Sequence, residues 1–307
     1  MALGATYDYT GASAKIAVSV GARVISVRVE GWELWEGQFI GPASATRLQP
    51  GRYELGPENG TSPSAFWAQI SPPVAKAVRM CKPTGTGWFE IESITYSGET
   101  PTSLSLRFEF LCPGSTAPVR GLVQWRADDA TPIAGPSPIP PGLWQPATGA
   151  TPATGNYIYL ESEPGDVVGG GLTRILTPPD STFSFNLGYL DRAISVSVNE
   201  NSTAWSGRFQ VMSSVSFPQV GYYPDMRGTS AIWGLNHVMG GMFWHGPNRC
   251  SSQGTPPIGL EAPYRGWFAI DSVSIVGGEV KSLDLRFEQR CEGQLPALRG
   301  KVHWVKG

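Results

Sequence analysis

The side chains best suited to hold a ligand are concentrated between residues 222 and 249, in a segment interrupted by glycines. The candidates there are Tyr222, Tyr223, Trp233, His237, Trp244 and His245. Aromatic rings beside hydrogen-bonding groups suit a sugar, because its C–H face stacks on a ring while its hydroxyls bond to polar groups. We expect these residues to form a lectin-like carbohydrate site. The alternative is that the rings pack beneath the loop as part of the core.

A second group of polar side chains precedes three consecutive glycines at 169–171. Glu161, Glu163 and Asp166 carry carboxylates, the ligand type that Ca²⁺ prefers. We interpret them as solvated charges of a loop, with Ca²⁺ binding as the alternative. No C-x-x-C occurs, so the cysteines and histidines do not form a zinc pattern, and we expect no metal centre.

Motifs that would identify a reaction do not occur in the sequence. It contains no G-x-S-x-G, no H-E-x-x-H and no G-x-x-x-x-G-K-[ST]. We therefore favour a binding protein over an enzyme, with carbohydrate or a cell-surface polymer as its partner. A polysaccharide-active hydrolase or lyase and a structural or adhesive surface protein are the alternatives.

Charge and hydropathy exclude two other classes of protein. The net charge is −2 and no run of Lys and Arg occurs, so the basic surface of a nucleic-acid-binding protein is missing. No apolar stretch approaches the ~20 residues that span a bilayer as a helix.

The two halves of the chain repeat one another. Residues 88–125 align without a gap to residues 267–304, and 17 of the 38 positions are identical. Residues 22–39 match residues 192–209 when one extra residue is allowed in the turn of the second copy. The sequence therefore predicts an internal duplication.

The elements that must position these side chains are predicted to be strands. Apolar and polar residues alternate in 104–109, 194–198 and 283–288, and the dipeptides at 97–98 and 277–278 suit hairpin turns. We predict an all-β protein of two tandem antiparallel β-sandwich (jelly-roll-like) modules.

The module boundaries follow from the composition between the two copies. We place the modules at residues 1–127 and 155–307, and a Pro-rich linker at 128–154. Its Pro, Ala, Thr and Gly content is typical of an extended spacer without a core. Trp144 is the exception, and we expect it to dock on one module.

Four cysteines lie at matching places in the two copies, two in each module. The duplication favours the disulfides Cys81–Cys112 and Cys250–Cys291, because each module should close by itself. Disulfides persist outside the cytosol, which predicts a secreted, periplasmic or cell-surface protein. The N-terminus has no basic or apolar region of a signal peptide, so we expect that the chain begins here naturally or that a signal has been removed.

Three segments of the second copy carry a resemblance to a known type of module. The segments 155–171 (GNYIYLESEPGDVVGGG), 267–274 and 286–304 resemble a β-sandwich module of secreted bacterial proteins, found alone, in tandem or attached to larger chains. The resemblance implies an exported accessory or surface module, and it brings no catalytic residues. This chain departs from the pattern at Arg290, where a His is expected, and in the shortened start of the first copy.

Overall fold

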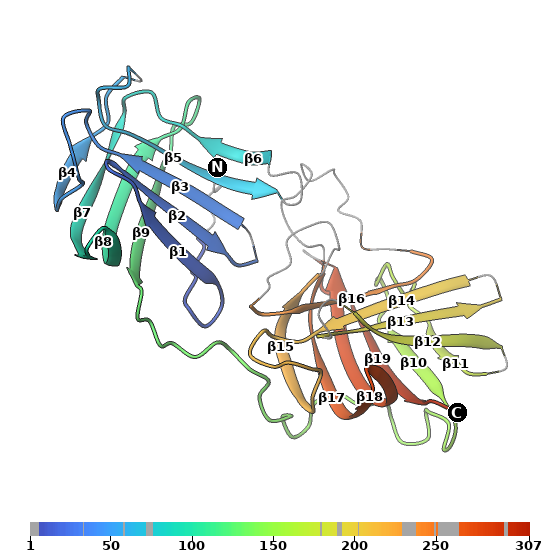
Figure 1. Cartoon of the computed structure of the whole chain (residues 1–307). Helices are drawn as coiled ribbons and strands as arrows, with labels where there is room; N and C mark the ends of the chain where they lie inside the picture. Colours follow the sequence, from blue (N-terminus) through green and yellow to red (C-terminus); the bar gives the residue numbers. More distant parts are fainter. Residues whose placement is uncertain are drawn as a thin grey trace. The chain divides into compact units, whose positions relative to one another are not determined.

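The computed structural model describes residues 6–32, 34–57, 59–71, 76–178, 180–188, 192–201, 203–228, 238–248, 250, 264–291 and 294–307. Every named element in these residues is a β-strand, and every strand pairing is antiparallel, which confirms the predicted all-β class. The chain divides into unit 1, Met1–Pro132, and unit 2, Ile133–Gly307. Each unit is built from two sheets (Figure 1).

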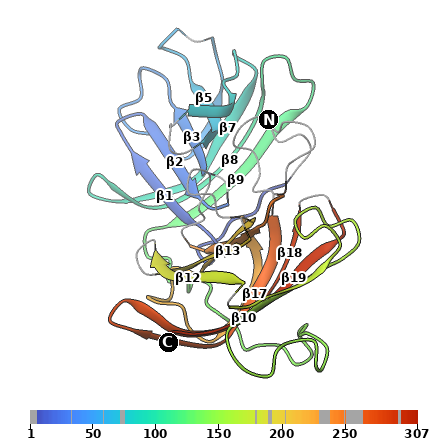
Figure 2. The ribbon, with the colours of Figure 1, turned by 90° about the vertical axis from the view of Figure 1, so that its right-hand side faces the viewer.

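Unit 1 contains a five-stranded and a four-stranded sheet. The first has the order β1 (Lys15–Val20), β2 (Val24–Glu30), β3 (Leu34–Ile40), β5 (Ser64–Ser71) and β6 (Lys76–Cys81). The second has the order β4 (Gly51–Glu54), β7 (Gly87–Ser97), β8 (Thr100–Leu111) and β9 (Pro118–Arg126). Figure 2 shows β2 and β3 in one layer and β7, β8 and β9 in the other.

Unit 2 contains a six-stranded and a four-stranded sheet. The larger has the order β11 (Thr173–Leu176), β10 (Tyr157–Ser162), β19 (Ala297–Val305), β18 (Glu279–Cys291), β17 (Tyr264–Val276) and β15 (Gly221–Arg227). The smaller has the order β12 (Ser181–Gly188), β13 (Ala193–Glu200), β14 (Thr203–Gln210) and β16 (Gly241–His245).

The strand pairings of the two units correspond where their sequences repeat. The order β4-β7-β8-β9 of unit 1 recurs in unit 2 as β15-β17-β18-β19. The register corresponds too: Val27 lies opposite Gly37 on β2 and β3, and Val196 lies opposite Gly207 on β13 and β14. Structural comparison of the two units can therefore proceed residue by residue.

Each core lies between the two sheets of its unit, around three phenylalanines that recur. In unit 1 the ring of Phe39 lies 5.5 Å from that of Phe89 and 5.2 Å from that of Phe108. In unit 2 the ring of Phe209 contacts Phe268 and Phe287 at 5.5 and 5.4 Å. Phe39 and Phe209 come from one sheet and their partners from the other, so the alternating apolar faces of both sheets are buried against each other.

The predicted hairpins and disulfides are confirmed. Gly98 turns β7 into β8 and the pair Gly277–Gly278 turns β17 into β18, all with positive φ, which glycine adopts without steric cost. Disulfides join Cys81 to Cys112 and Cys250 to Cys291.

Part of the Pro-rich segment, from Ile133 on, falls in unit 2 and contacts it at two places. The main chain of Ser137 pairs with that of Tyr222 on β15. The carbonyls of Leu143 and Trp144 accept hydrogen bonds from the guanidinium of Arg286 at 3.1 and 2.8 Å. These contacts hold the Trp144 backbone on unit 2. In the part of the chain that the structure describes, no helix is long and apolar enough to cross a membrane.

Candidate functional site

Two of the six residues predicted to bind a ligand are core residues. Tyr223 is fully buried, stacks on Phe268 at 4.4 Å, and donates its hydroxyl to the carbonyl of Gln219 at 2.8 Å. Trp244 is also fully buried, because its ring fills the space over Gly207 that a side chain would otherwise occupy. Neither ring presents a face to a ligand. Both agree with the alternative that the aromatic residues of this segment pack in the core.

Of the other four candidates, two lie in the described residues, one on each sheet of unit 2. Tyr222 is half-buried on β15, with its ring 5.9 Å from that of Trp267. His245 is half-buried on β16, in the other sheet, and stacks on Phe243 at 4.3 Å. Trp233 and His237 lie outside the described residues, so the carbohydrate site predicted between 222 and 249 stays a prediction.

The acids in and after β10 of unit 2 accept hydrogen bonds or form ion pairs within the protein. Asp166 is buried, and its carboxylate accepts hydrogen bonds from the Ser162 hydroxyl and the Gly169 N–H, both at 2.7 Å. The interpretation of this residue as a solvated charge is therefore wrong. Glu163 accepts the N–H of Ala297 at 2.9 Å and pairs with Arg299 at 2.8 Å, and these contacts lower its pKa.

Among the residues that the structure describes, no group of three or more His, Cys, Asp or Glu side chains is arranged to hold a metal ion. The oxygens of Asp166 and Glu163 are committed to hydrogen bonds within the protein. The loop geometry explains these acids as turn-forming and ion-pairing residues.

A cleft of about 690 Å³ opens in unit 1 between its two sheets, along strand β9. Seven consecutive residues of β9, from Pro118 to Gln124, line it. Side chains alternate between the two faces of a strand, so a lining by successive residues means that the edge of the strand itself borders the cleft. Five aromatic rings form much of the remaining wall: Tyr7, Tyr9, Trp35, Trp67 and Phe108.

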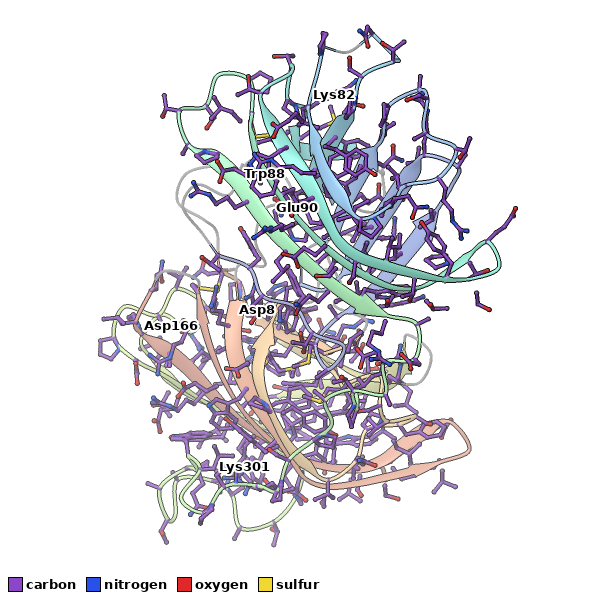
Figure 3. All side chains as sticks on the ribbon, turned by 90° about the vertical axis from the view of Figure 1, so that its left-hand side faces the viewer. Asp8, Lys82, Trp88, Glu90, Asp166 and Lys301 are labelled. Atoms are coloured by element: carbon purple, nitrogen blue, oxygen red, sulfur yellow. A yellow bond between two sulfur atoms is a disulfide. The ribbon has the colours of Figure 1, made fainter. Side chains whose placement is uncertain are left out.

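The N-terminal residues form one wall of this cleft. The ring of Tyr7 packs edge-on against Trp35 at 5.1 Å, and the ring of Tyr9 fills the space beside Gly31. Asp8 lies between them in the sequence, lines the cleft and is exposed, so it brings a carboxylate to the cleft. Figure 3 labels Asp8 among the side chains.

In unit 2, strand β10 occupies the place of this cleft. β10 pairs with β19, the counterpart of β9, with Leu160 opposite Gly300 and Ile158 opposite Val302. Both apolar side chains of β10 are buried in the core of unit 2. In the described part of unit 1, β9 is the last strand of its sheet and pairs with β8 alone.

The residues that receive β10 in unit 2 recur around the cleft of unit 1. Gly121 takes the place of Gly300, and each glycine has a phenylalanine ring against it, Phe108 in unit 1 and Phe287 in unit 2. Trp67 corresponds to Trp244, since these residues lie opposite Gly37 and Gly207 respectively. Trp67 is only half-buried, whereas Trp244 is fully buried.

Smaller side chains on the opposite sheet also widen the cleft. Ile16, which lines the cleft, lies opposite Val29 in the position that Phe183 takes opposite Val198 in unit 2. Phe183 is larger than Ile16, so it extends further from its own sheet toward the sheet that contains β19. Among the described residues of unit 1, the cleft thus goes with a missing neighbour of β9 and a smaller wall residue.

The corresponding arginines of β9 and β19 also differ, because the one on β9 is more exposed and has fewer acidic partners among the described residues. In unit 2, Arg299 pairs with Glu288 at 2.7 Å and with Glu163 at 2.8 Å, and its side chain is 18% exposed. In unit 1 the corresponding Arg120 pairs with Glu109 at 2.7 Å, and its side chain is 69% exposed. Arg120 lines the cleft, so a positive charge stands at its rim.

Comparison of the chain with protein-family models, with curated proteins and with solved structures gives no match. The cleft of unit 1 is the site that sequence reasoning missed.

Proposed function

We propose that this chain is a non-enzymatic binding protein, and that the cleft of unit 1 holds an extended polypeptide segment as an added strand beside β9. The observation that carries the proposal is the strand β10 of unit 2. It occupies the corresponding position, is held by main-chain pairing with β19, and places Ile158 and Leu160 between the sheets. Strand addition to an open sheet edge is an established mode of peptide recognition.

The physical chemistry of the cleft supports this mode of binding. The N–H and C=O groups on the outer side of a sheet edge provide hydrogen-bond partners for an added strand. Burying two aliphatic side chains contributes about 3–6 kcal/mol, before the cost of association is subtracted. Main-chain hydrogen bonds add to this gain and the cost of association subtracts from it, so we expect weak binding of a short peptide, with a dissociation constant of roughly 1 mM.

Carbohydrate binding is the second candidate, and one observation favours it for the same cleft. Aromatic rings line the cleft together with Asp8, Arg120 and Gln124, which offer polar groups to hydroxyls. A sugar would make no use of the main-chain N–H and C=O groups along the edge of β9, whereas an added strand would pair with them. The polypeptide is therefore the first proposal, and a sugar is an outcome of its test.

The two disulfides support placing this binding protein outside the cytosol, on the cell surface or in the surrounding medium. A partner there would be a secreted or surface protein with an extended segment.

The test uses the full oxidised chain and a synthetic peptide with the sequence of residues 155–163, GNYIYLESE. Trp35 and Trp67 line the cleft, so intrinsic fluorescence should change on binding, and hydrogen exchange should show new protection in β9. We expect saturable binding of this peptide and none of a scrambled peptide of the same composition. A response to polysaccharides without a response to the peptide would overturn the proposal in favour of the second candidate.

A further inference from the structure

In unit 2, the strand β10 and the residue after it supply carboxylates to Arg299 of β19. Glu161 lies opposite Arg299 in the pairing of β10 with β19, and their charged groups approach to 3.9 Å. Glu163 follows on the same chain segment and pairs with Arg299 at 2.8 Å. Glu288, on β18, supplies a third carboxylate at 2.7 Å.

Unit 1 also has the arginine, and it has the carboxylate on the neighbouring strand β8. Arg120 and Glu109 correspond to Arg299 and Glu288, and their charged groups are 2.7 Å apart. In the described residues, the pair in unit 1 has no counterpart of Glu161 or Glu163. Glu109 is bonded by Nε of Arg120, and the side chain is exposed, so the terminal N–H groups of Arg120 can donate to a carboxylate on an incoming strand.

Gly121 determines where an apolar side chain of an incoming strand can be placed. A Cβ built on Gly300 would lie 3.1 Å from the Leu160 side chain, so the glycine leaves the room that this leucine uses. Gly121 provides the same room, and Val123 corresponds to Val302, which lies opposite Ile158. An incoming strand therefore meets apolar space at two alternate positions and a positive charge next to one of them.

We propose that the cleft of unit 1 selects extended segments of the pattern apolar-x-apolar-acid, with the acid opposite Arg120 and the apolar residues opposite Gly121 and Val123. This inference rests on the proposed function and names the ligand that the site prefers. In the chain's own β10, residues Ile158 to Glu161 follow this pattern. The partner is thus a polypeptide strand with an acidic residue directly after its second buried apolar residue.

A charge exchange between protein and peptide tests the pattern. The probes are the peptide of residues 155–163 and its variant with arginine in place of Glu161 and Glu163. We expect Arg120→Glu to weaken binding of the first peptide by roughly twofold to fivefold, the range of an exposed ion pair, and to restore binding of the charge-reversed one. Arg120→Gln serves as a second variant, because it avoids placing two acids side by side with Glu109.

Arg126→Glu is the matched control, because it makes the same charge change on β9. Arg126 pairs with Asp128 and does not line the cleft. Equal peptide affinities for the Arg120→Glu and Arg126→Glu variants would overturn the inference and leave strand addition standing. Absence of any saturable peptide binding to the unmodified chain would instead overturn the proposed function itself.

Discussion

The side-chain amide of Gln289 binds both main-chain groups of Trp244, across the two sheets of unit 2. The N–H of Trp244 donates to Oε1 at 2.6 Å, and Nε2 donates to the carbonyl of Trp244 at 2.9 Å. In unit 1 the corresponding Trp67 lies opposite Cys81 of the neighbouring strand β6. The amide of Gln289 thus supplies hydrogen-bond partners to the main chain of β16, whereas β5 of unit 1 receives such partners from the neighbouring strand β6.

Replacing Gln289 with Ala should destabilise unit 2. The change leaves two buried main-chain groups without partners, which costs about 1–3 kcal/mol for each group. Calorimetry of the full chain should show one transition lowered and the other unchanged. Gln49→Ala, at an exposed position of unit 1, is the control. An unaltered thermogram for the Gln289 variant would show that the two contacts are energetically unimportant.

Alanine at either of two corresponding glycines should destabilise its unit. A Cβ on Gly37 would lie 2.2 Å from the ring of Trp67, and one on Gly207 would lie 2.3 Å from the ring of Trp244. We expect a loss of about 1–3 kcal/mol in each case, the usual cost of overpacking a core. Gly21→Ala, with no atom within 4 Å of the new Cβ, should leave the denaturation midpoint unchanged.

The ion pairs of Glu163 should make unit 2 lose stability in acid. The Ala297 N–H and the Arg299 guanidinium hold the pKa of Glu163 below its usual 4.5, so its carboxylate stabilises the fold above that pH and ceases to do so as pH falls through the lowered value. Glu163→Gln should therefore cost stability at pH 7 and progressively less below pH 4.5. Denaturant titrations at several pH values measure this difference. A constant difference down to pH 2 would contradict the assignment.

Alkali should unfold unit 2 through Tyr223. Burial raises the pKa of this phenol to about 12. The neutral form is therefore favoured in the fold. Its contribution is complete below the unfolded pKa of about 10 and is lost as pH rises through the folded value. Tyr223→Phe should remove the part of alkaline unfolding that follows tyrosinate absorbance, while losing the hydrogen bond to Gln219 at neutral pH.

Local patterns in the sequence were sufficient for the strands and turns. Alternation in 104–109 and 283–288 predicts β8 and β18, and Gly98 and Gly277 fall at the hairpins. The disulfides followed from matching positions in the two copies. These features depend on neighbouring residues or on the repeat itself, both of which can be seen in one sequence.

The candidate site could not be predicted in the same way. Whether Trp244 is a ligand platform or a core ring depends on Gly207, on another strand. The cleft lies beside β9, which in the described part of unit 1 lacks the neighbour that β19 has, and this is a relationship between segments distant in the chain. Asp166 looked like a loop charge because its hydrogen-bond donors, Ser162 and Gly169, carry no sequence signature of their own.

The disulfides have a mechanical consequence for a chain pulled from its two ends. Each bond closes a loop, and the sequence separation of the two cysteines is 31 for Cys81–Cys112 and 41 for Cys250–Cys291. Force cannot extend these loops, so each unit should lengthen by roughly 100–140 Å less than its residue number allows. Reduction of the disulfides should restore that length in single-molecule force spectra. The closed loops contain the hairpin of β7 and β8 in unit 1 and that of β17 and β18 in unit 2, so these hairpins carry no load even when the rest of the unit is unfolded by force.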